Sequence, residues 1–180
     1  TEVIHEVIIK SAADLISEDT PDYQYLAARL AIFHLRKKAY AQFDPPPLFS
    51  HVKKMVDGGW YDKALLEDFD EKDFNKMNDF IRHSRDLTFS YSAVKQLQGK
   101  YLVQDRVTGQ IFESAQFLYV LVAASLFAHY PKTSRMRFIE RFYNAISTFK
   151  ISLPTPIMAG IRTPTRQFSS CVLIESGDSL

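Results

Sequence analysis

Cysteine and glycine are both scarce in this sequence of 180 residues. Because Cys171 is the only cysteine, an internal disulfide and a zinc site built from cysteines are both excluded. Only 6 glycines occur, whereas average usage of about 7% would give about 13, and this scarcity favours a mostly helical chain. The glycine-rich phosphate-binding patterns GxGxxG, GxxxxGKS and GxxxxGKT are absent as well.

The sequence also lacks an excess of charge and a long apolar run. Its 22 basic and 21 acidic residues give a net charge of +1, which excludes a strongly basic surface for nucleic acid. No run of about 18 apolar residues predicts a membrane span, and the opening residues do not resemble a signal peptide. We therefore expect a cytoplasmic protein that binds neither nucleic acid nor a membrane.

Apolar residues at helical spacing predict two helices before a proline-rich break. The first covers residues 2–17, and the second starts at Thr20-Pro21 and runs to about Tyr40. One stripe of the second helix carries Leu26, Leu30, Phe33 and Lys37. Pro45-Pro46-Pro47 cannot continue a helix, so this segment is predicted to be a stiff linker and a domain boundary.

Short local signals predict the elements that follow the linker. A helix from Leu48 is expected to stop at Gly58-Gly59, and Asp70 is expected to cap another helix, with Asp73 in the capping-box position. Residues 100–113 are typical of a β-hairpin with a glycine-containing turn. Two apolar helices are then expected to begin after Ser114 and Ser134.

The character of the chain changes after Lys150. Residues 153–158 and 168–174 are predicted to form short buried strands, with a polar stretch between them. The pattern therefore indicates a helical pair, a helical domain with a hairpin, and the beginning of a strand-containing domain.

Cys171 is the first candidate for chemistry, and the residues alone leave two interpretations open. It is either a buried core cysteine or a redox-active or nucleophilic thiol, which nearby Arg166 would favour as a thiolate. Thr155, between two prolines, is either an ordinary strand start or an anion contact. Arg162 and Arg166 could bind phosphate or could be structural.

The positions of the histidines and lysines along the sequence do not predict a further binding or catalytic site. Taken alone, His5 and Lys37 are interpreted as solvated side chains. The five histidines show no metal-ligand spacing, so no metal site is expected.

Four stretches carry a family resemblance that extends over nearly the whole chain. They resemble the large (alpha) subunit of class I ribonucleoside-diphosphate reductases of the aerobic enterobacterial type. The stretches are residues 22–30 (DYQYLAARL), 101–109 (YLVQDRVTG), 142–153 and 153–174 (LPTPIMAGIRTPTRQFSSCVLI).

The resemblance implies a mainly α chain that contains parts of three regions. Residues 1–42 would be the C-terminal part of an ATP-cone, which senses ATP against dATP. Residues 43–150 would be the helical N-terminal domain with its small β-hairpin. Residues 151–180 would begin a ten-stranded α/β barrel that holds the active site.

The resemblance also implies roles for individual residues. Cys171 would be a redox-active thiol whose disulfide partner lies outside the chain, and Thr155 and Ser170 would hold the substrate. Thr1, His5 and Lys37 would contact ATP in the activity site. The start of the specificity site for a deoxynucleoside triphosphate effector would be formed by Asp178, Ser179 and Leu180.

The activity implied is reduction of ribonucleoside diphosphates to deoxyribonucleoside diphosphates by thiyl-radical chemistry. The radical would come from a metal-containing small (beta) subunit, thioredoxin or glutaredoxin would restore the thiols, and two large subunits would form a homodimer. The radical cysteine would lie beyond Leu180, so the fragment alone is expected to be inactive and to bind no cofactor. The alternative is a helical binding module without catalytic chemistry, which the low glycine content and the missing motifs favour.

Overall fold

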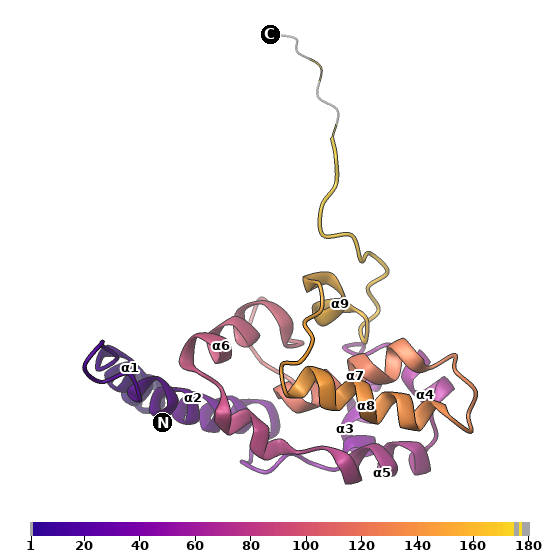
Figure 1. Cartoon of the computed structure of the whole chain (residues 1–180), viewed down its shortest axis with the longest axis horizontal. Helices are drawn as coiled ribbons and strands as arrows, with labels where there is room; N and C mark the ends of the chain where they lie inside the picture. The colour runs from indigo at the N-terminus through magenta and orange to yellow at the C-terminus, as the bar shows by residue number, and fades with distance from the viewer. Residues whose placement is uncertain (1, 175–176, 178–180) are drawn as a thin grey trace.

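The computed structural model describes residues 2–174 and 177, and this part of the chain is helical with no strand. The helices form one body, from which the segment after the last helix extends away (Figure 1). The α-helices are α1 (Glu2–Asp14), α2 (Tyr23–Tyr40), α3 (Leu48–Asp57), α4 (Ala64–Asp68), α5 (Glu71–Phe80), α6 (Tyr91–Gln96), α7 (Ala115–Phe127), α8 (Arg135–Ser147) and α9 (Thr155–Gly160). A 3₁₀-helix, η1 (His83–Thr88), and a π-helix, η2 (Leu97–Tyr101), complete the set for these residues.

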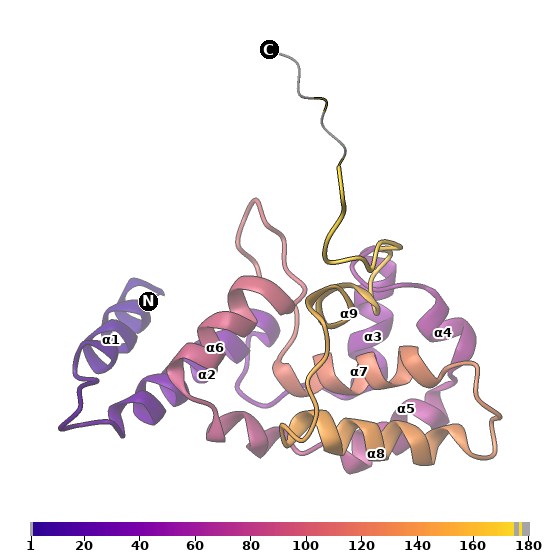
Figure 2. The ribbon, with the colours of Figure 1, turned by 45° about the horizontal axis from the view of Figure 1, so that its top comes forward.

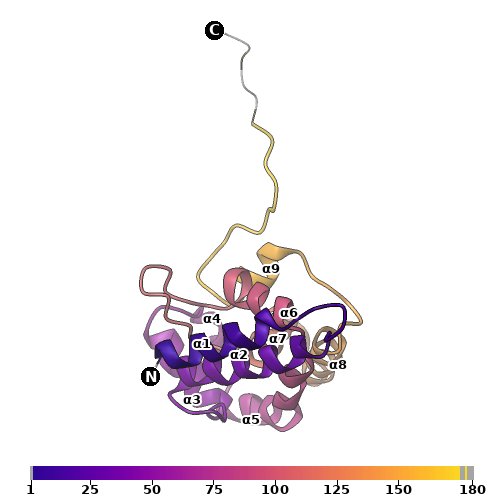
Figure 3. The same ribbon diagram turned by 90° about the vertical axis from the view of Figure 1, so that its left-hand side faces the viewer.

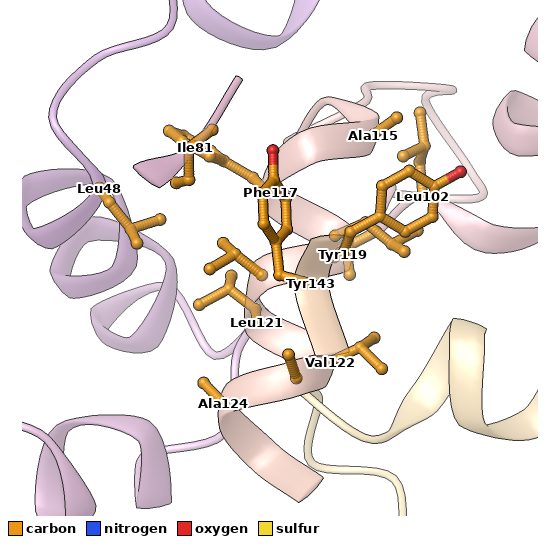
Figure 4. Packing of buried hydrophobic residues seen from close by; sticks show 14 of the residues in the cluster. Leu48, Ile81, Leu102, Ala115, Phe117, Tyr119, Leu121, Val122, Ala124 and Tyr143 are labelled. Carbon is orange, nitrogen blue, oxygen red and sulfur yellow. The ribbon is translucent and has the colours of Figure 1, made fainter. Parts of the chain in front are cut away.

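Helix α7 is the centre of the core. Every residue from Ala115 to Ala124 is buried, which is the behaviour of a helix that is apolar on all sides. It lies alongside α8 (Figure 2). The buried side chains near it include Leu48 of α3, Ile81 just after α5 and Tyr143 of α8 (Figure 4). The body is therefore built around one buried helix.

The first two helices pack against each other as predicted (Figure 3), but the stripe noted in the sequence is not the buried face of α2. Leu26 and Phe33 are 46% and 37% exposed. The buried face consists of Ala27, Ala28, Ala31, Ile32, Leu35 and Arg36. Small alanine side chains let neighbouring helices approach closely, so this face packs better than the larger apolar stripe.

The start of α2 also differs from the prediction. The helix begins at Tyr23 with Asp22 as the N-cap residue, so Thr20 and Pro21 lie before it. The Thr20 hydroxyl instead donates a hydrogen bond to the carbonyl of Leu15 at 2.6 Å. Thr20 therefore closes the loop between the two helices rather than capping the second.

Two local signals after the linker are confirmed. Helix α3 ends at Asp57, and Gly59 has the left-handed φ of 75° that favours glycine. Asp70 caps α5, because its Oδ1 accepts a hydrogen bond from the Asp73 N–H at 2.9 Å. Both signals act over a few residues, which is why the sequence reveals them.

Replacing Asp70 with alanine is expected to lower the free energy of unfolding by about 1 kcal/mol, because the freed N–H of Asp73 loses its acceptor. Urea unfolding of the chain, followed by circular dichroism, measures the difference. Asp79→Ala is the matched control, since Asp79 is an exposed aspartate at the opposite end of the same helix. Equal losses in the two variants would contradict the capping role.

The predicted β-hairpin is reduced to an irregular loop. Its first expected residues belong to η2, and the described residues retain one isolated bridge between Gln104 and Ile111. The turn itself is present, because the Val107 N–H donates to Asp105 Oδ1 at 2.8 Å and Gly109 has a φ of 70°. The glycine turn was predicted correctly, whereas the regular strands on either side of it were not.

The two strands expected after Lys150 are also wrong for the described residues. Residues 155–160 form α9, which begins after Pro154 and accepts Pro156 in its first turn, where a proline costs no helical hydrogen bond. Residues 168–174 are exposed and belong to no strand. A strand needs a hydrogen-bonded neighbour, and none of the described segments pairs with this one.

Candidate functional site

Cys171 lies in the exposed segment that extends from the helical body (Figure 1). The Ser170 hydroxyl is its neighbour and donates toward the Cys171 Sγ at 3.8 Å, and the Ser169 hydroxyl reaches the Cys171 carbonyl at 3.4 Å. The interpretation of Cys171 as a buried core cysteine is therefore wrong for this structure. An exposed thiol beside the Ser170 hydroxyl is accessible to a substrate or to another thiol.

The arginine expected to assist this thiol is engaged elsewhere. Arg166 forms an ion pair with Asp62, with Nη1 and Oδ2 2.6 Å apart. The hydrogen bond from Arg166 is the first cause that lowers the pKa of the Asp62 carboxyl, against the opposing effect of burial. The structure thus brings Cys171 together with Ser170 but not with Arg166.

Thr155 is the exposed first residue of α9, which packs against α7 and η2. One side of α9 borders an open hollow of about 640 Å³, whose lining includes Pro156, Lys100 and Arg106. Figure 2 shows the chain passing from α9 into the extended segment that holds Cys171. Among the described residues no hydrogen bond joins Thr155 to Ser170 or Cys171.

Arg162 does not serve as a phosphate-binding residue here. Its side chain is 0% exposed, and its guanidinium pairs with the buried carboxylate of Glu113. An external anion therefore cannot reach it without displacing Glu113. This ion pair could not be predicted from local sequence patterns, because Glu113 and Arg162 are 49 residues apart in the chain.

His5 and Lys37, from α1 and α2, meet at the ring of Phe33. The His5 ring centroid lies 6.3 Å from that of Phe33, and the Lys37 Nζ lies 5.2 Å from the same centroid. His34 adds a second imidazole, with its centroid 5.3 Å from that of His5. An ammonium group and an imidazole that share one aromatic neighbour can bind an anionic ligand that carries a planar group.

The remaining predicted site residues cannot be placed. Thr1, Asp178, Ser179 and Leu180 lie outside the described residues. The structure therefore offers no geometry for these parts of the two predicted effector sites.

A cluster of acids lies close to the pair of imidazoles. Glu2, Glu6 and His34 each place one potential ligand atom within 4.8 Å of the others. The Lys38 Nζ, however, is 3.0 Å from Glu2 Oε1, and its hydrogen bond is the first cause that lowers the pKa of Glu2. Because Lys38 already neutralises Glu2, a cation at this position would have to displace the ammonium group. Burial lowers the pKa of His34, and the charge of His5 adds to this effect.

A buried network connects α2 with the rest of the helical body. Arg36 donates to Asp86 Oδ2 at 2.8 Å and to the carbonyl of His83 at 2.6 Å. Gln116 Nε2 donates to the other Asp86 oxygen at 2.8 Å, and the Tyr143 hydroxyl donates to Gln116 Oε1 at 2.7 Å. The helix that carries Phe33 and Lys37 is thus tied by hydrogen bonds to η1, α7 and α8.

Comparisons with known proteins identify the family. Residues 87–166 match the family model described as ribonucleotide reductase, all-alpha domain. All 180 residues align with the ribonucleoside-diphosphate reductase 1 subunit alpha of Escherichia coli K12 at 72% identity. The alpha subunits of Haemophilus influenzae and Enterobacteria phage T4 align over the same full chain at 71% and 48% identity. The chain belongs to the ribonucleoside-diphosphate reductase alpha-subunit family.

The family assignment confirms the resemblance found in the sequence and defines its extent. These alignments include every residue of this chain. The chain spans only 24% of the length of the E. coli and phage T4 subunits. It corresponds to the N-terminal region of the reductase subunit, and its helical body agrees with the all-alpha domain of the family. In the part of the chain that the structure describes, no helix is both long and apolar enough to cross a membrane.

Buried His51 and half-buried His83 predict a dependence of stability on pH. Burial lowers the pKa of His51 and of His83 to about 4, and the charge of Arg36 adds to the effect on His83. The folded pKa lies below the unfolded value of about 6.5, so the unfolded chain takes up protons first. We expect full stability above pH 6.5 and a loss of up to about 1.4 kcal/mol per pH unit per histidine between pH 6.5 and 5.

Urea unfolding of the chain at several pH values between 7.5 and 5 measures this slope. His51→Gln removes one titrating group and is expected to reduce the slope by about half. His129→Gln is the matched control for the change of side chain, because His129 is exposed. A free energy of unfolding that stays constant from pH 7 to pH 5 would contradict the assignment of His51 and His83 as neutral in the folded chain.

Proposed function

We propose that this chain is part of the alpha subunit of a class I ribonucleoside-diphosphate reductase, acting in the cytoplasm. The enzyme would convert ribonucleoside diphosphates into deoxyribonucleoside diphosphates for DNA synthesis. The observation that carries the proposal is the 72% identity to the E. coli alpha subunit over every residue of the chain. The exposed thiol of Cys171, in the longest stretch of family resemblance, supports it.

The proposed domain organisation follows the family. Residues 1–42 would complete an ATP-cone, residues 43–150 would be the helical domain, and residues 151–180 would begin the catalytic barrel. The match of residues 87–166 to the all-alpha domain supports the middle assignment. The three prolines in the linker between α2 and α3 are consistent with the first boundary.

The proposed chemistry assigns Cys171 to the reduction step. A thiyl radical on a cysteine outside this chain would take the 3′-hydrogen of the substrate ribose, and the 2′-hydroxyl would leave as water. The same cysteine would return a hydrogen to C3′ after the reduction. Cys171 and a second thiol, also outside the chain, would supply two electrons and two protons and form a disulfide. Thioredoxin or glutaredoxin would then reduce that disulfide, and the small subunit would supply the radical.

The proposed binding roles use the side chains described above. Thr155 and Ser170 carry hydroxyl groups that can bond to a nucleotide. His5 and Lys37, gathered around one aromatic ring, would bind the adenine nucleotide effector together with Thr1. Asp178, Ser179 and Leu180 would belong to the specificity site, and a homodimer of alpha subunits would complete it.

A chimaeric subunit tests this function. The matched 180 residues of the E. coli alpha subunit are replaced by this chain, and deoxyribonucleoside diphosphate formation is assayed with the small subunit and thioredoxin. We expect turnover comparable with that of the unsubstituted subunit, and none without the small subunit. The chain alone should give no turnover, because the family's radical cysteine lies outside it. A folded chimaera that binds the small subunit but forms no product would refute the proposal.

A further inference from the structure

The side chain of Arg162 occupies a position that needs an explanation. It lies in the chain between Thr155 and Cys171 and is the largest fully buried side chain of the described residues. Taking a guanidinium group out of water is costly, and the cost is offset only when its charge and its N–H groups are all paired.

The pairing of Arg162 is nearly complete. Its Nε donates to Glu113 Oε2 at 3.0 Å, and its Nη2 donates to Glu113 Oε1. Its Nη1 donates to the carbonyl of Met158 at 2.5 Å, and Nη2 also donates to the carbonyl of Tyr101 at 2.8 Å. A planar guanidinium group that donates to both oxygens of a carboxylate fixes the relative orientation of the two side chains as well as their distance. The single ammonium group of a lysine cannot do this.

Glu113 anchors this pair to the helical body. Its side chain is 0% exposed, and Oε2 accepts a hydrogen bond from the Tyr61 hydroxyl at 2.7 Å. Oε1 accepts from the Val103 N–H at 2.7 Å. The carboxylate thus collects donors from three separate segments of the chain, and a glutamine amide could not accept from all of them.

The backbone of Arg162 is held as well, because its carbonyl accepts a hydrogen bond from the Asp62 N–H at 2.9 Å. Apolar packing alone is a weak restraint here. Helix α9 has six residues, of which Met158 and Gly160 are the buried ones, and its other side borders the open hollow. Polar contacts at Arg162 therefore set the rotation and position of α9 and the point from which the chain leaves toward Cys171.

We propose that Glu113 and Arg162 are positioning residues for the reductase reaction: their buried ion pair places the segment that carries Thr155 and Cys171. The proposal rests on the function proposed above. Neither residue touches substrate, since both are fully enclosed, and they act through α9 and the backbone of residues 158–162. Misplacing a reacting group by about 1 Å can cost on the order of a hundredfold in rate, so a small shift of this anchor is enough to matter.

The test uses the full-length alpha subunit that contains this chain, with the small subunit and thioredoxin. Arg162→Lys keeps the charge but removes the planar fork. The double variant Glu113→Leu/Arg162→Met replaces the ion pair with apolar groups, which often preserves stability. Arg166→Gln is the matched control, because Arg166 lies on the same segment but its side chain is 69% exposed. Thermal unfolding, kcat and the KM for the nucleoside diphosphate are measured for each protein.

A positioning role predicts separate effects on folding and on kinetics. The double variant should unfold close to the temperature of the unsubstituted protein, yet both it and Arg162→Lys should lose at least about tenfold in kcat and show a raised KM. A merely structural role would reduce the amount of active enzyme and leave KM unchanged. Arg166→Gln should behave as the unsubstituted protein.

Two results would overturn the inference and can be told apart. If the unsubstituted subunit turns over and Arg162→Lys keeps its kcat and KM, the positioning role fails while the reductase function stands. If the unsubstituted subunit forms no deoxyribonucleoside diphosphate, the proposed function fails and the positioning role fails with it.

Discussion

Replacing Cys171 with serine in the full-length alpha subunit is expected to lower kcat for ribonucleoside diphosphate reduction by on the order of a thousandfold or more. A serine hydroxyl has nearly the size of the thiol but cannot be oxidised to a disulfide, so the two electrons for the ribose are no longer available. Formation of deoxyribonucleoside diphosphate with the small subunit and thioredoxin measures the loss.

Ser169→Ala is the matched control for this substitution. Ser169 lies in the same exposed segment, and its hydroxyl contacts the backbone carbonyl of Cys171 rather than its sulfur. We expect turnover close to that of the unsubstituted protein. Normal turnover in Cys171→Ser would contradict the redox role of Cys171 and would favour a helical binding module without catalytic chemistry.

Replacing Asp86 with alanine is expected to lower the free energy of unfolding of the chain by about 3–5 kcal/mol. Asp86 and Arg36 are 2% and 3% exposed, so the substitution leaves a buried guanidinium without its counter-charge. Gln116 Nε2 loses its acceptor at the same time. Urea unfolding followed by circular dichroism measures the change.

An exposed ion pair serves as the control for Asp86. The Lys63 Nζ lies 3.3 Å from Glu67 Oε1 on the surface, and the two side chains are 81% and 61% exposed. Lys63→Ala should cost less than about 0.5 kcal/mol, because solvent screens such pairs. The double variant Arg36→Met/Asp86→Leu should recover most of the stability lost in Asp86→Ala. A loss in Asp86→Ala as small as that in Lys63→Ala would contradict the structural role of this network.

Features that depend on a few neighbouring residues could be predicted from the sequence. The cap at Asp70 and the stop at Gly58-Gly59 depend on one side chain or one backbone angle, and both are confirmed. The buried face of α2 could not be predicted from a count of apolar residues, because Arg36 and small alanines make up most of it. An arginine is ordinarily assigned to the surface, and only its buried partner reverses that assignment.

The strands predicted after Lys150 fail for a different reason. A run such as residues 168–174 is typical of a strand, but a strand forms only against a hydrogen-bonded neighbour, and the described residues provide none. At residues 155–160, the prolines that suggested an extended segment occupy the helix start, where they are tolerated.

The candidate site could be predicted only in part. Cys171, Thr155 and Ser170 stand out because the family resemblance is strongest around them, and their roles remain predictions. Arg162 was noticed as a cation, but its function depends on Glu113, which is distant in sequence and becomes its neighbour only in the folded chain. Spacing along the chain cannot reveal a contact of this kind.

The redox state of Cys171 after a single turnover tests the central claim most directly. The full-length alpha subunit is first reduced, freed of reductant, and mixed with the small subunit and a nucleoside diphosphate. Free thiols are then alkylated, and the peptide that contains Cys171 is analysed by mass spectrometry. The reductase function predicts that Cys171 becomes protected in a disulfide in proportion to the deoxyribonucleoside diphosphate formed. Product formation with Cys171 still fully alkylated would contradict it.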